Sequence, residues 1–470
     1  MSVPSSSSPT PSVAILGAGA TGLTAAYRLA RRGVPVRLFE LTDRVGGAIR
    51  TERIEGWLIE GGPNSLLTGD PVVTSLIGEV GLGDERVTAN QAAKNRYLIR
   101  DGRMVAAPMS PPAFLTTPLF SLSAKIRLFG DLFSRRRIRT SDVSLGDFIA
   151  DHFGQEVVDY GLNPFVGGVY AGDPKKLSAR HAFPQLWEIE QRHGSIIRGQ
   201  IAAAKARKAS GQPRRKSEIV SFREGLQTLP NALASRLPPG VLTCNAVIEA
   251  LVPGRPWSIV WRDARNGGGT HTENFTAVIV ALPAPALAQL RFGTLGERPL
   301  ASLDSIEHPP VSSLFLGYRR EQVAHPLDGF GVLAPEIERR SVLGILFSSS
   351  LFPGRAPDGH VALTVMSGGM RQPEIARLSP EKMLAAVERD LRELLGVSGA
   401  PVFQRHSFWP RAIPQYNLGY ERYLEAMATA ERSYPGLHIG GQCRDGIAVP
   451  ACLAAGEKLA SRVEAAARPS

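Results

Sequence analysis

A glycine-rich stretch near the N-terminus, SVAILGAGATGLTAAYRLARRGVPVRLFE, limits the folds that are open to this chain. An apolar run, Val13–Leu16, precedes Gly17, Gly19 and Gly22 in the spacing GxGxxG, and a helical pattern and a second apolar run ending at Glu40 follow. These glycines permit a tight turn, a close approach of the backbone to a pyrophosphate, and close packing of helix on strand. An acid at the end of the second strand can accept hydrogen bonds from ribose hydroxyls. The stretch therefore predicts a βαβ unit that binds a dinucleotide.

Length and composition indicate a folded protein of several domains. The chain has 470 residues, of which 43% are hydrophobic and 21% charged, enough for two or three domains with a sizeable core. Its three cysteines, Cys244, Cys443 and Cys452, have no CxxC spacing, and its nine histidines show no HxxH or HExxH pattern. We therefore expect a reduced protein without a disulfide framework, and the spacing predicts no metal site.

Two stretches bear on where the protein acts. Residues 1–11 are rich in serine and proline and lack both a basic start and an apolar stretch, which predicts a disordered lead rather than a signal peptide. The apolar stretch AVIVALPAPALAQL is short and is interrupted by two prolines, so we expect no membrane-spanning helix. The prediction is a cytoplasmic protein whose membrane contact, where there is any, is peripheral and on the inner face of the cell membrane.

The formal net charge of +11 is concentrated in two basic clusters, SRRRIRT and KARKASGQPRRKSE. Both clusters can be solvated surface, or they can attract anionic lipid or an anionic substrate. Aromatic residues do not alternate with the basic ones and no nucleic-acid-binding motif is present, so no nucleic-acid partner is expected.

The type of dinucleotide follows from the residues after the second strand. Glu40, Arg44, Gly46, Gly47 and Thr51 form the pattern ExxxRxGGxxxT. This pattern resembles the flavoprotein family of amine oxidases, phytoene desaturases and protoporphyrinogen oxidases, and the resemblance implies non-covalent FAD. The residues that it assigns to the cofactor are Gly17, Ala18, Gly19, Ala20, Thr21, Gly22, Glu40, Leu41, Arg44, Gly46, Gly47, Ala48, Gly62, Pro63, Asn64, Ser65, Val247, Gln442, Ile447, Ala448 and Val449.

A second glycine-rich junction, GGQCRDGIAVPACLAAG, stands near the end of the chain. Helix formers after Pro450 predict a helix that begins there, with its first N–H groups available to a partner. The resemblance implies that the late strand GLHIGG leads into this turn, and that the helix start faces the flavin N1 and C2 oxygen, where negative charge collects on reduction. An ordinary surface helix is the alternative. Asp445 is either a base near the flavin or the partner of Arg444 in a structural pair.

Several further stretches resemble the protoporphyrinogen oxidases of the same family: NPFVGGVYAGDPKKLSARHAFPQLWEIEQRHGSIIRG, SFREGLQTLPNALASRL, GFGVLAPE and LGILFSSSLFPGRAPDG. Gln442 and Cys443 depart from the family pattern. The resemblance implies an α/β fold: a discontinuous FAD-binding, Rossmann-like domain of the glutathione-reductase type, an α+β substrate domain, and a helical membrane-associated domain. The expected domains are residues 12–88, 217–290 and 434–466 for FAD, 89–108 and 291–433 for substrate, and 109–216 for the helices.

Two local patterns lie outside the cofactor segments. NRYLIRDGRMVAAP predicts a hairpin that turns at Asp101–Gly102. In SLSAKIRLFGDLFSRRRI, the apolar residues Leu122, Ile126, Phe129 and Phe133 recur at helical spacing, with a basic cluster after them. Such a stripe either packs in the core or lies on a bilayer.

The resemblance also implies the substrate site. Arg96 stands where related plant enzymes carry an arginine that meets a propionate, and a guanidinium matches a carboxylate bidentately. Phe347 stands where the family stacks a side chain on the macrocycle, with Leu314, Phe330 and Gly168 as companions. The alternatives are a surface role for Arg96 and a core role for Phe347.

The implied activity is the six-electron oxidation of protoporphyrinogen IX to protoporphyrin IX in haem biosynthesis. FAD would accept hydride at N5 and O2 would reoxidise it to give H2O2, with no dedicated catalytic acid or base. Three alternatives stay open: a coproporphyrinogen III oxidase of the same family, a flavin amine oxidase, and a non-catalytic flavin-binding homologue. The expected partners are a porphyrinogen and O2, and a second copy of the chain in a homodimer.

Overall fold

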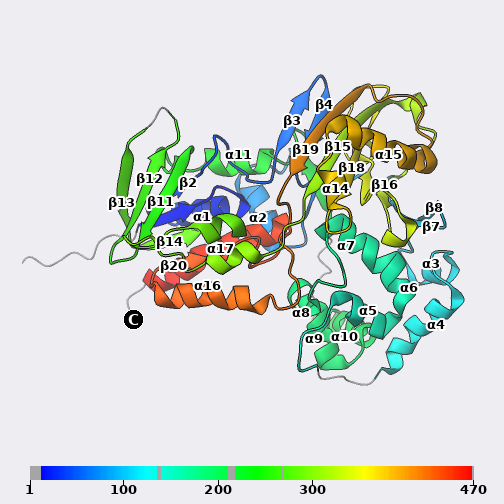
Figure 1. Ribbon diagram of the computed structural model, residues 1–470, viewed down its shortest axis with the longest axis horizontal. Coiled ribbons are helices and arrows are strands. Elements are labelled where there is room, and N and C mark those ends of the chain that lie inside the picture. The colour runs from blue at the N-terminus through cyan, green and yellow to red at the C-terminus, as the bar shows by residue number, and fades with distance from the viewer. Residues whose placement is uncertain (1–11, 135–138, 210–216, 266–267, 468–470) are drawn as a thin grey trace, which may run out of the picture.

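The computed structural model describes residues 12–134, 139–209, 217–265 and 268–467. The predicted N-terminal lead and parts of both basic clusters lie outside the described residues. Figure 1 shows three lobes: the two ends of the chain meet in one, a strand-rich second lobe lies beside it, and a helical third lobe lies below the second. Within the described ranges, no helix combines the length and the apolar character needed to cross a membrane.

Five parallel strands form the sheet of the first lobe. Their residues are almost all apolar, as expected of strands that are buried on both faces. Val13 pairs with Val36 and Ala277, and Val278 pairs with Leu437, so the beginning, middle and end of the chain share one sheet. This confirms the βαβ unit and the predicted return of a middle and a late strand. In spatial order the strands are β10 (Leu242–Thr243), β2 (Val36–Phe39), β1 (Val13–Leu16), β14 (Ala277–Val280) and β20 (Leu437–Ile439).

Both faces of the parallel sheet are covered, because alternate side chains of β1 enter two different cores. The face of Val13 and Ile15 carries α1 (Ala20–Arg31), α2 (Pro71–Glu79), α11 (Thr228–Ser235) and α17 (Val449–Ala467). The face of Ala14 and Leu16 carries an antiparallel sheet, β11 (Ala246–Val252), β12 (Trp257–Asp263) and β13 (Thr270–Phe275), with α12 (Ala284–Gln289), the 3-10 helix η3 (Ala301–Ser305) and α16 (Glu421–Ser433). The architecture is α/β.

A seven-stranded mixed sheet forms the second lobe (upper right in Figure 1). Its predicted hairpin is confirmed: Asp101 and Gly102 both have positive φ, as a tight two-residue turn requires. In order, the strands are β19 (Phe403–Trp409), β15 (Val311–Arg319), β18 (His360–Gly368), β17 (Gly344–Leu346), β16 (Gly329–Leu333), β7 (Asn95–Arg100) and β8 (Arg103–Ala106). The helices of this lobe are α13 (Ser348–Leu351), α14 (Pro373–Ala376) and α15 (Pro380–Leu395).

Two small sheets complete the strands. The first is the ribbon β3 (Thr51–Ile54) and β4 (Trp57–Glu60), and the second is β5 (Leu66–Leu67), β9 (Ile219–Phe222) and β6 (Arg86–Thr88). The third lobe is helical, as predicted. Its helices are α3 (Pro111–Thr116), α4 (Leu122–Gly130), α5 (Leu145–Phe153), α6 (Gln155–Val157), the π-helical turn η2 (Val158–Leu162), α7 (Asn163–Tyr170), α8 (Ala179–Ala182), α9 (Pro184–His193) and α10 (Ile196–Ala209).

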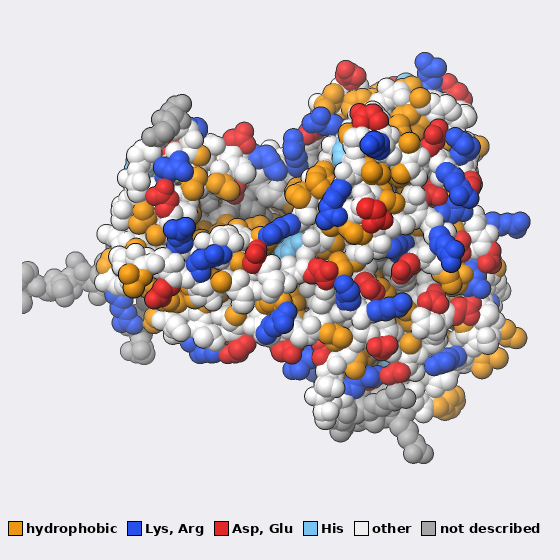
Figure 2. All heavy atoms as spheres, in the orientation of Figure 1, with side chains coloured by type: hydrophobic (Ala, Val, Ile, Leu, Met, Phe, Trp, Pro, Cys, Tyr) orange, Lys and Arg blue, Asp and Glu red, His pale blue; other side chains and the backbone are white. Residues whose placement is uncertain are grey.

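The apolar stripe of α4 and the turn after it faces away from the core. Leu122, Ile126, Phe129 and Phe133 are 73%, 64%, 46% and 84% exposed, whereas Ala124 of the same helix is buried. Figure 2 shows hydrophobic side chains gathered at the lower right edge, where Figure 1 places α4. Of the two readings open from the sequence, the core role is therefore wrong for these four side chains.

Candidate functional site

The first glycine-rich turn lies at the carboxyl end of β1. Gly17 has a φ of +95°, and a Cβ on it would lie 2.7 Å from the carbonyl oxygen of Ala281. A Cβ on Gly22 would lie 1.9 Å from the oxygen of Gly17, so only glycine lets α1 pack here. Gly19, by contrast, borders open space, with nothing within 4 Å of an added Cβ. Among the described residues no side chain caps α1 and none in its first turn is acidic, so its first N–H groups are available to an anion such as a diphosphate.

The carboxylate of Glu40 reaches this turn from the end of β2. Its Oε2 accepts a hydrogen bond from the N–H of Ala18 at 2.8 Å. The Glu40 carbonyl accepts one from Ala246 at 2.8 Å, which brings Val247 beside it, and Leu41 is exposed next to both. The acid that the sequence predicts for a ribose therefore lies against the first glycine-rich turn.

The loop after β2 is held against the first turn. Gly46 donates its N–H to the oxygen of Ala18 at 2.8 Å. Arg44 donates to the carbonyls of Gly47 at 2.8 Å and Ile49 at 2.9 Å, so its guanidinium fixes the loop conformation. Gly46 and Gly47 both have positive φ, which explains why two glycines are needed.

The predicted segment Gly62, Pro63, Asn64 and Ser65 follows β4 and touches the same loop. A Cβ on Gly62 would lie 1.9 Å from the oxygen of Ala48. Asn64 also lines a small pocket, which includes residues of the mixed sheet; its lining is Leu58, Glu60, Asn64, Phe315, Ser348, Leu351, Phe352, Arg355 and Thr364. This pocket joins a predicted cofactor segment to the second lobe.

Glu60 in that pocket is a buried acid that sequence reasoning missed. Its carboxylate accepts hydrogen bonds from Thr51 Oγ1 at 2.6 Å and from the N–H of Leu226 at 2.8 Å. Burial raises its pKa to about 7, against the lowering effect of these bonds and of the Arg355 charge. In the sequence, Glu60 is an acidic residue at the end of an apolar strand, and nothing in this pattern indicates that its side chain is buried.

Two tyrosines hold the second glycine-rich turn. The hydroxyl of Tyr416 donates to the carbonyl of Gln442 at 2.7 Å and accepts from the N–H of Gly446 at 3.0 Å. The hydroxyl of Tyr420 donates to the carbonyl of Cys443 at 2.7 Å, and the two rings stack with centroids 4.3 Å apart. Burial raises the pKa of both hydroxyls, so they stay protonated donors. Sequence reasoning missed both, although their i, i+4 spacing was visible.

The pairing of Arg444 with Asp445, one of the two roles that the sequence left open for Asp445, is wrong. Arg444 pairs instead with Glu431 of α16 at 2.9 Å and donates to the carbonyl of Ile439 at 2.8 Å. Asp445 accepts the N–H of Gly441 at 2.8 Å. Each side chain therefore fixes the turn through partners of its own.

The two glycine-rich turns adjoin. Helix α17 begins at Val449, one residue before the predicted Pro450. Thr21 Oγ1 of α1 donates to the carbonyl of Cys452 at 2.9 Å, and a Cβ on Gly456 would lie 2.4 Å from the oxygen of Thr21. Both helix starts therefore lie at one edge of the parallel sheet. We call residues 17–22, 44–48 and 441–449 the three-loop cradle; Ile447 within it is half-buried and Ala448 is exposed.

Three of the predicted substrate residues lie on neighbouring elements. Arg96 of β7 is exposed, and its guanidinium carbon lies 5.7 Å from the ring centroid of Phe330 on the adjacent β16. Phe330 packs on the cluster of Leu351 and Phe352, which also line the Asn64 pocket. Gly168 of α7 faces Leu333 of β16, where an added Cβ would approach within 2.4 Å.

Phe347 and Leu314 are placed differently. Both side chains are 0% exposed and belong to the core between the mixed sheet and α15. The ring of His325 lies 5.5 Å from that of Phe347. Since neither side chain reaches a surface, their burial favours the core role over the wall of a pocket.

The three-loop cradle and the parallel sheet define a protein that binds a dinucleotide at the carboxyl ends of its strands. A family model described as flavin containing amine oxidoreductase matches residues 20–464. The chain belongs to this family and is an FAD-dependent oxidoreductase.

Several relatives that match almost the whole chain are porphyrinogen oxidases. Protoporphyrinogen oxidase 2 of Arabidopsis thaliana is 34% identical, over 96% of this chain and 93% of the relative. The mitochondrial protoporphyrinogen oxidase of Nicotiana tabacum is 33% identical, over 96% and 94%. Coproporphyrinogen III oxidase of Bacillus subtilis is 29% identical, over 96% and 97%.

Solved structures agree on the fold. A candidate protoporphyrinogen oxidase from Exiguobacterium sp. 255-15 superposes with a TM-score of 0.80 at 23% identity, covering 98% of this chain and all of that one. Putrescine oxidase with bound putrescine gives 0.68 at 17% identity, covering 97% and 99%.

Proposed function

We propose that this protein oxidises protoporphyrinogen IX to protoporphyrin IX, a step of porphyrin and haem biosynthesis, with O2 as electron acceptor and H2O2 as product. The observation that carries the proposal is the 34% identity to a protoporphyrinogen oxidase over 96% of the chain. The flavin, when bound, accepts the hydride equivalents that the macrocycle gives up.

The residues of the chain would bind and orient both molecules. The first N–H groups of α1 hold the diphosphate and Glu40 holds the ribose. The start of α17 would present the positive end of a helix dipole to the flavin, which would favour negative charge on the bound cofactor. Arg96 binds a substrate carboxylate, which fixes the edge of the macrocycle that is presented. Asp445 is bound to Gly441, so no base is assigned to it.

Coproporphyrinogen III is the second candidate substrate, because the coproporphyrinogen III oxidases of two bacteria match 96% and 97% of this chain. It carries four carboxylates instead of two. The test follows porphyrin fluorescence in air with each porphyrinogen supplied to flavin-loaded protein. A faster turnover of protoporphyrinogen IX supports the proposal, and a faster turnover of coproporphyrinogen III reverses the order of the two candidates.

We also propose that the exposed stripe of α4 contacts the inner face of a membrane. Four large apolar side chains on one face, followed by basic residues, suit an anionic lipid surface. Phe133→Ser combined with Ile126→Ser should abolish cosedimentation with anionic lipid vesicles and leave melting unchanged. Ile337→Ser, at an exposed residue of the second lobe, is the control. Equal sedimentation of all three proteins would refute the contact.

We also propose that the chain divides into domains at the boundaries predicted from the sequence, that the protein is cytoplasmic, and that it forms a homodimer. Light scattering tests the dimer, with a mass of twice the 50.5 kDa chain expected. A mass of one chain at micromolar concentration would exclude it.

A further inference from the structure

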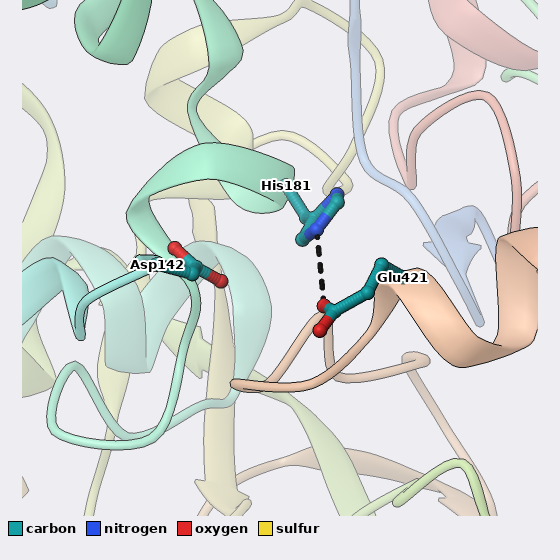
Figure 3. Close-up of side chains that lie close together, drawn as sticks. All are labelled: Asp142, His181 and Glu421. Atoms are coloured by element: carbon teal, nitrogen blue, oxygen red, sulfur yellow. Dashed lines mark ion pairs between the residues drawn. The ribbon is translucent and has the colours of Figure 1, made fainter. Parts of the chain in front are cut away.

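Three side chains from distant parts of the sequence converge outside the three-loop cradle, between the helical lobe and α16 (Figure 3). Asp142 lies before α5, His181 lies in α8, and Glu421 is the first residue of α16. One potential ligand atom of each lies within 4.8 Å of those of the other two. His181 Nε2 and Glu421 Oε2 are 3.4 Å apart, within ion-pair distance (dashed line in Figure 3). The same separation is about the spacing of two ligands on a tetrahedral ion with bonds near 2.1 Å.

Asp142 and His181 each have one buried polar atom without a hydrogen bond in the part of the chain that the structure describes. Asp142 Oδ2 and His181 Nε2 are shielded from solvent, and neither has a hydrogen-bond partner in the described residues. Such atoms are costly unless a ligand or water satisfies them. The other oxygen of Asp142, Oδ1, accepts the N–H groups of Val143 at 2.9 Å and Arg180 at 3.3 Å. These bonds fix the carboxylate and leave Oδ2 free for a ligand.

We propose that Asp142, His181 and Glu421 bind a divalent transition-metal ion of the Zn2+ class. One imidazole nitrogen and two carboxylate oxygens suit Zn2+, whereas Mg2+ and Ca2+ take oxygen ligands alone. The two carboxylates supply the negative charge that such an ion needs. The Glu421 side chain is 63% exposed. The ion could therefore enter from solvent, and a water molecule could occupy its fourth coordination position.

The ion would connect the helical lobe to the flavin-binding lobe. Glu421 follows Tyr420, whose hydroxyl holds the carbonyl of Cys443 in the cradle. Asp142 and His181 belong to the helical lobe, so the same ion would tie both lobes together. Binding of the ion would not require the substrate. It would stabilise the fold, because only the native state would bind the ion.

The test uses full-length, untagged protein stripped with EDTA and titrated with ZnCl2 in a calorimeter. We expect one ion per chain and a rise in melting temperature on addition of ZnCl2. Glu421→Gln, at a mostly exposed position, should lower the affinity at least tenfold and abolish the rise without harming the fold. His181→Ala should do the same, and His193→Ala, at an exposed histidine of α9, should behave as wild type.

CoCl2 in place of ZnCl2 should give visible absorption bands in wild type that are missing in Glu421→Gln. The proposal is overturned when wild type binds no Zn2+, or when Glu421→Gln and wild type bind it equally well. A stable Glu421→Gln protein keeps the test decisive even where His181→Ala fails to fold.

Discussion

Gly19 and Gly22 differ in what an added methyl group would meet. Gly19 has an ordinary extended backbone, with φ −73°, and open space around its Cβ position. Gly19→Ala should therefore leave melting of the flavin-free protein unchanged, but its methyl group would occupy the space of the diphosphate. We expect at least a tenfold loss of flavin content, measured by visible absorption per chain. Gly22→Ala should give insoluble protein, because its methyl group would overlap the oxygen of Gly17. A fully flavin-loaded Gly19→Ala would contradict this account of the cradle.

Phe347 is expected to act through the core. Phe347→Ala should lower the free energy of unfolding by about 3–5 kcal/mol, the range for removing a buried aromatic ring. The flavin content of the folded fraction should stay at the wild-type level. Thermal melting followed by flavin fluorescence measures both. Phe330→Ala, at a half-buried residue, is the control and should cost less stability. Slow turnover with unchanged melting in Phe347→Ala would return Phe347 to the substrate site.

Arg96 is expected to act on the substrate. It is exposed, and among the described residues no carboxylate pairs with it. Arg96→Ala should weaken apparent substrate affinity about ten- to a hundredfold, or roughly 1.5–3 kcal/mol, the value of a hydrogen bond to a charged group. Arg96→Lys should recover part of the loss, and Arg103→Ala on the neighbouring strand should have no effect. Wild-type KM and kcat in Arg96→Ala would remove this residue from the site.

At the scale of elements, a buried charged network joins the helices of the third lobe. His152 of α5 bonds through Nδ1 to Asp131 at 2.5 Å and through Nε2 to Glu190 of α9 at 3.1 Å. Arg139 donates to the same Glu190 at 2.9 Å. Burial alone would lower the pKa of His152, but the hydrogen bonds and charges of Asp131 and Glu190 outweigh it and raise the pKa to about 9. The network thus holds the histidine as a cation.

This raised pKa makes the stability of the helices dependent on pH. A histidine whose folded pKa exceeds its unfolded value of about 6.5 stabilises the fold fully below that value, and the stabilisation is lost as pH rises toward 9. The melting temperature should therefore fall between pH 6.5 and 9.5. The corresponding loss in the free energy of unfolding is up to about 3 kcal/mol. His152→Gln should be less stable at pH 6.5 and show a flatter pH profile, while His193→Gln keeps the wild-type slope. Parallel profiles for all three proteins would refute the charged network.

At the scale of the whole molecule, the sequence predicted the parts whose geometry is local. GxGxxG with its flanking strands located β1, α1 and β2, and Asp101–Gly102 located a hairpin. Side-chain environments were harder to predict, because they depend on contacts made across the chain. The apolar periodicity of α4 did not indicate whether its stripe faces the core or the solvent. The position of Phe347 in the family pattern did not indicate that its side chain is buried. The convergence of Asp142, His181 and Glu421 has no spacing signal, since it exists only in three dimensions.

A flavin held in the three-loop cradle is expected to oxidise a porphyrinogen. Anaerobic mixing of flavin-loaded protein with protoporphyrinogen IX tests it most directly, with visible flavin absorption as the readout. We expect rapid bleaching, recovery on admission of air, and the appearance of porphyrin fluorescence. Flavin that stays oxidised with protoporphyrinogen IX and coproporphyrinogen III, but is bleached by an amine such as putrescine, would contradict it.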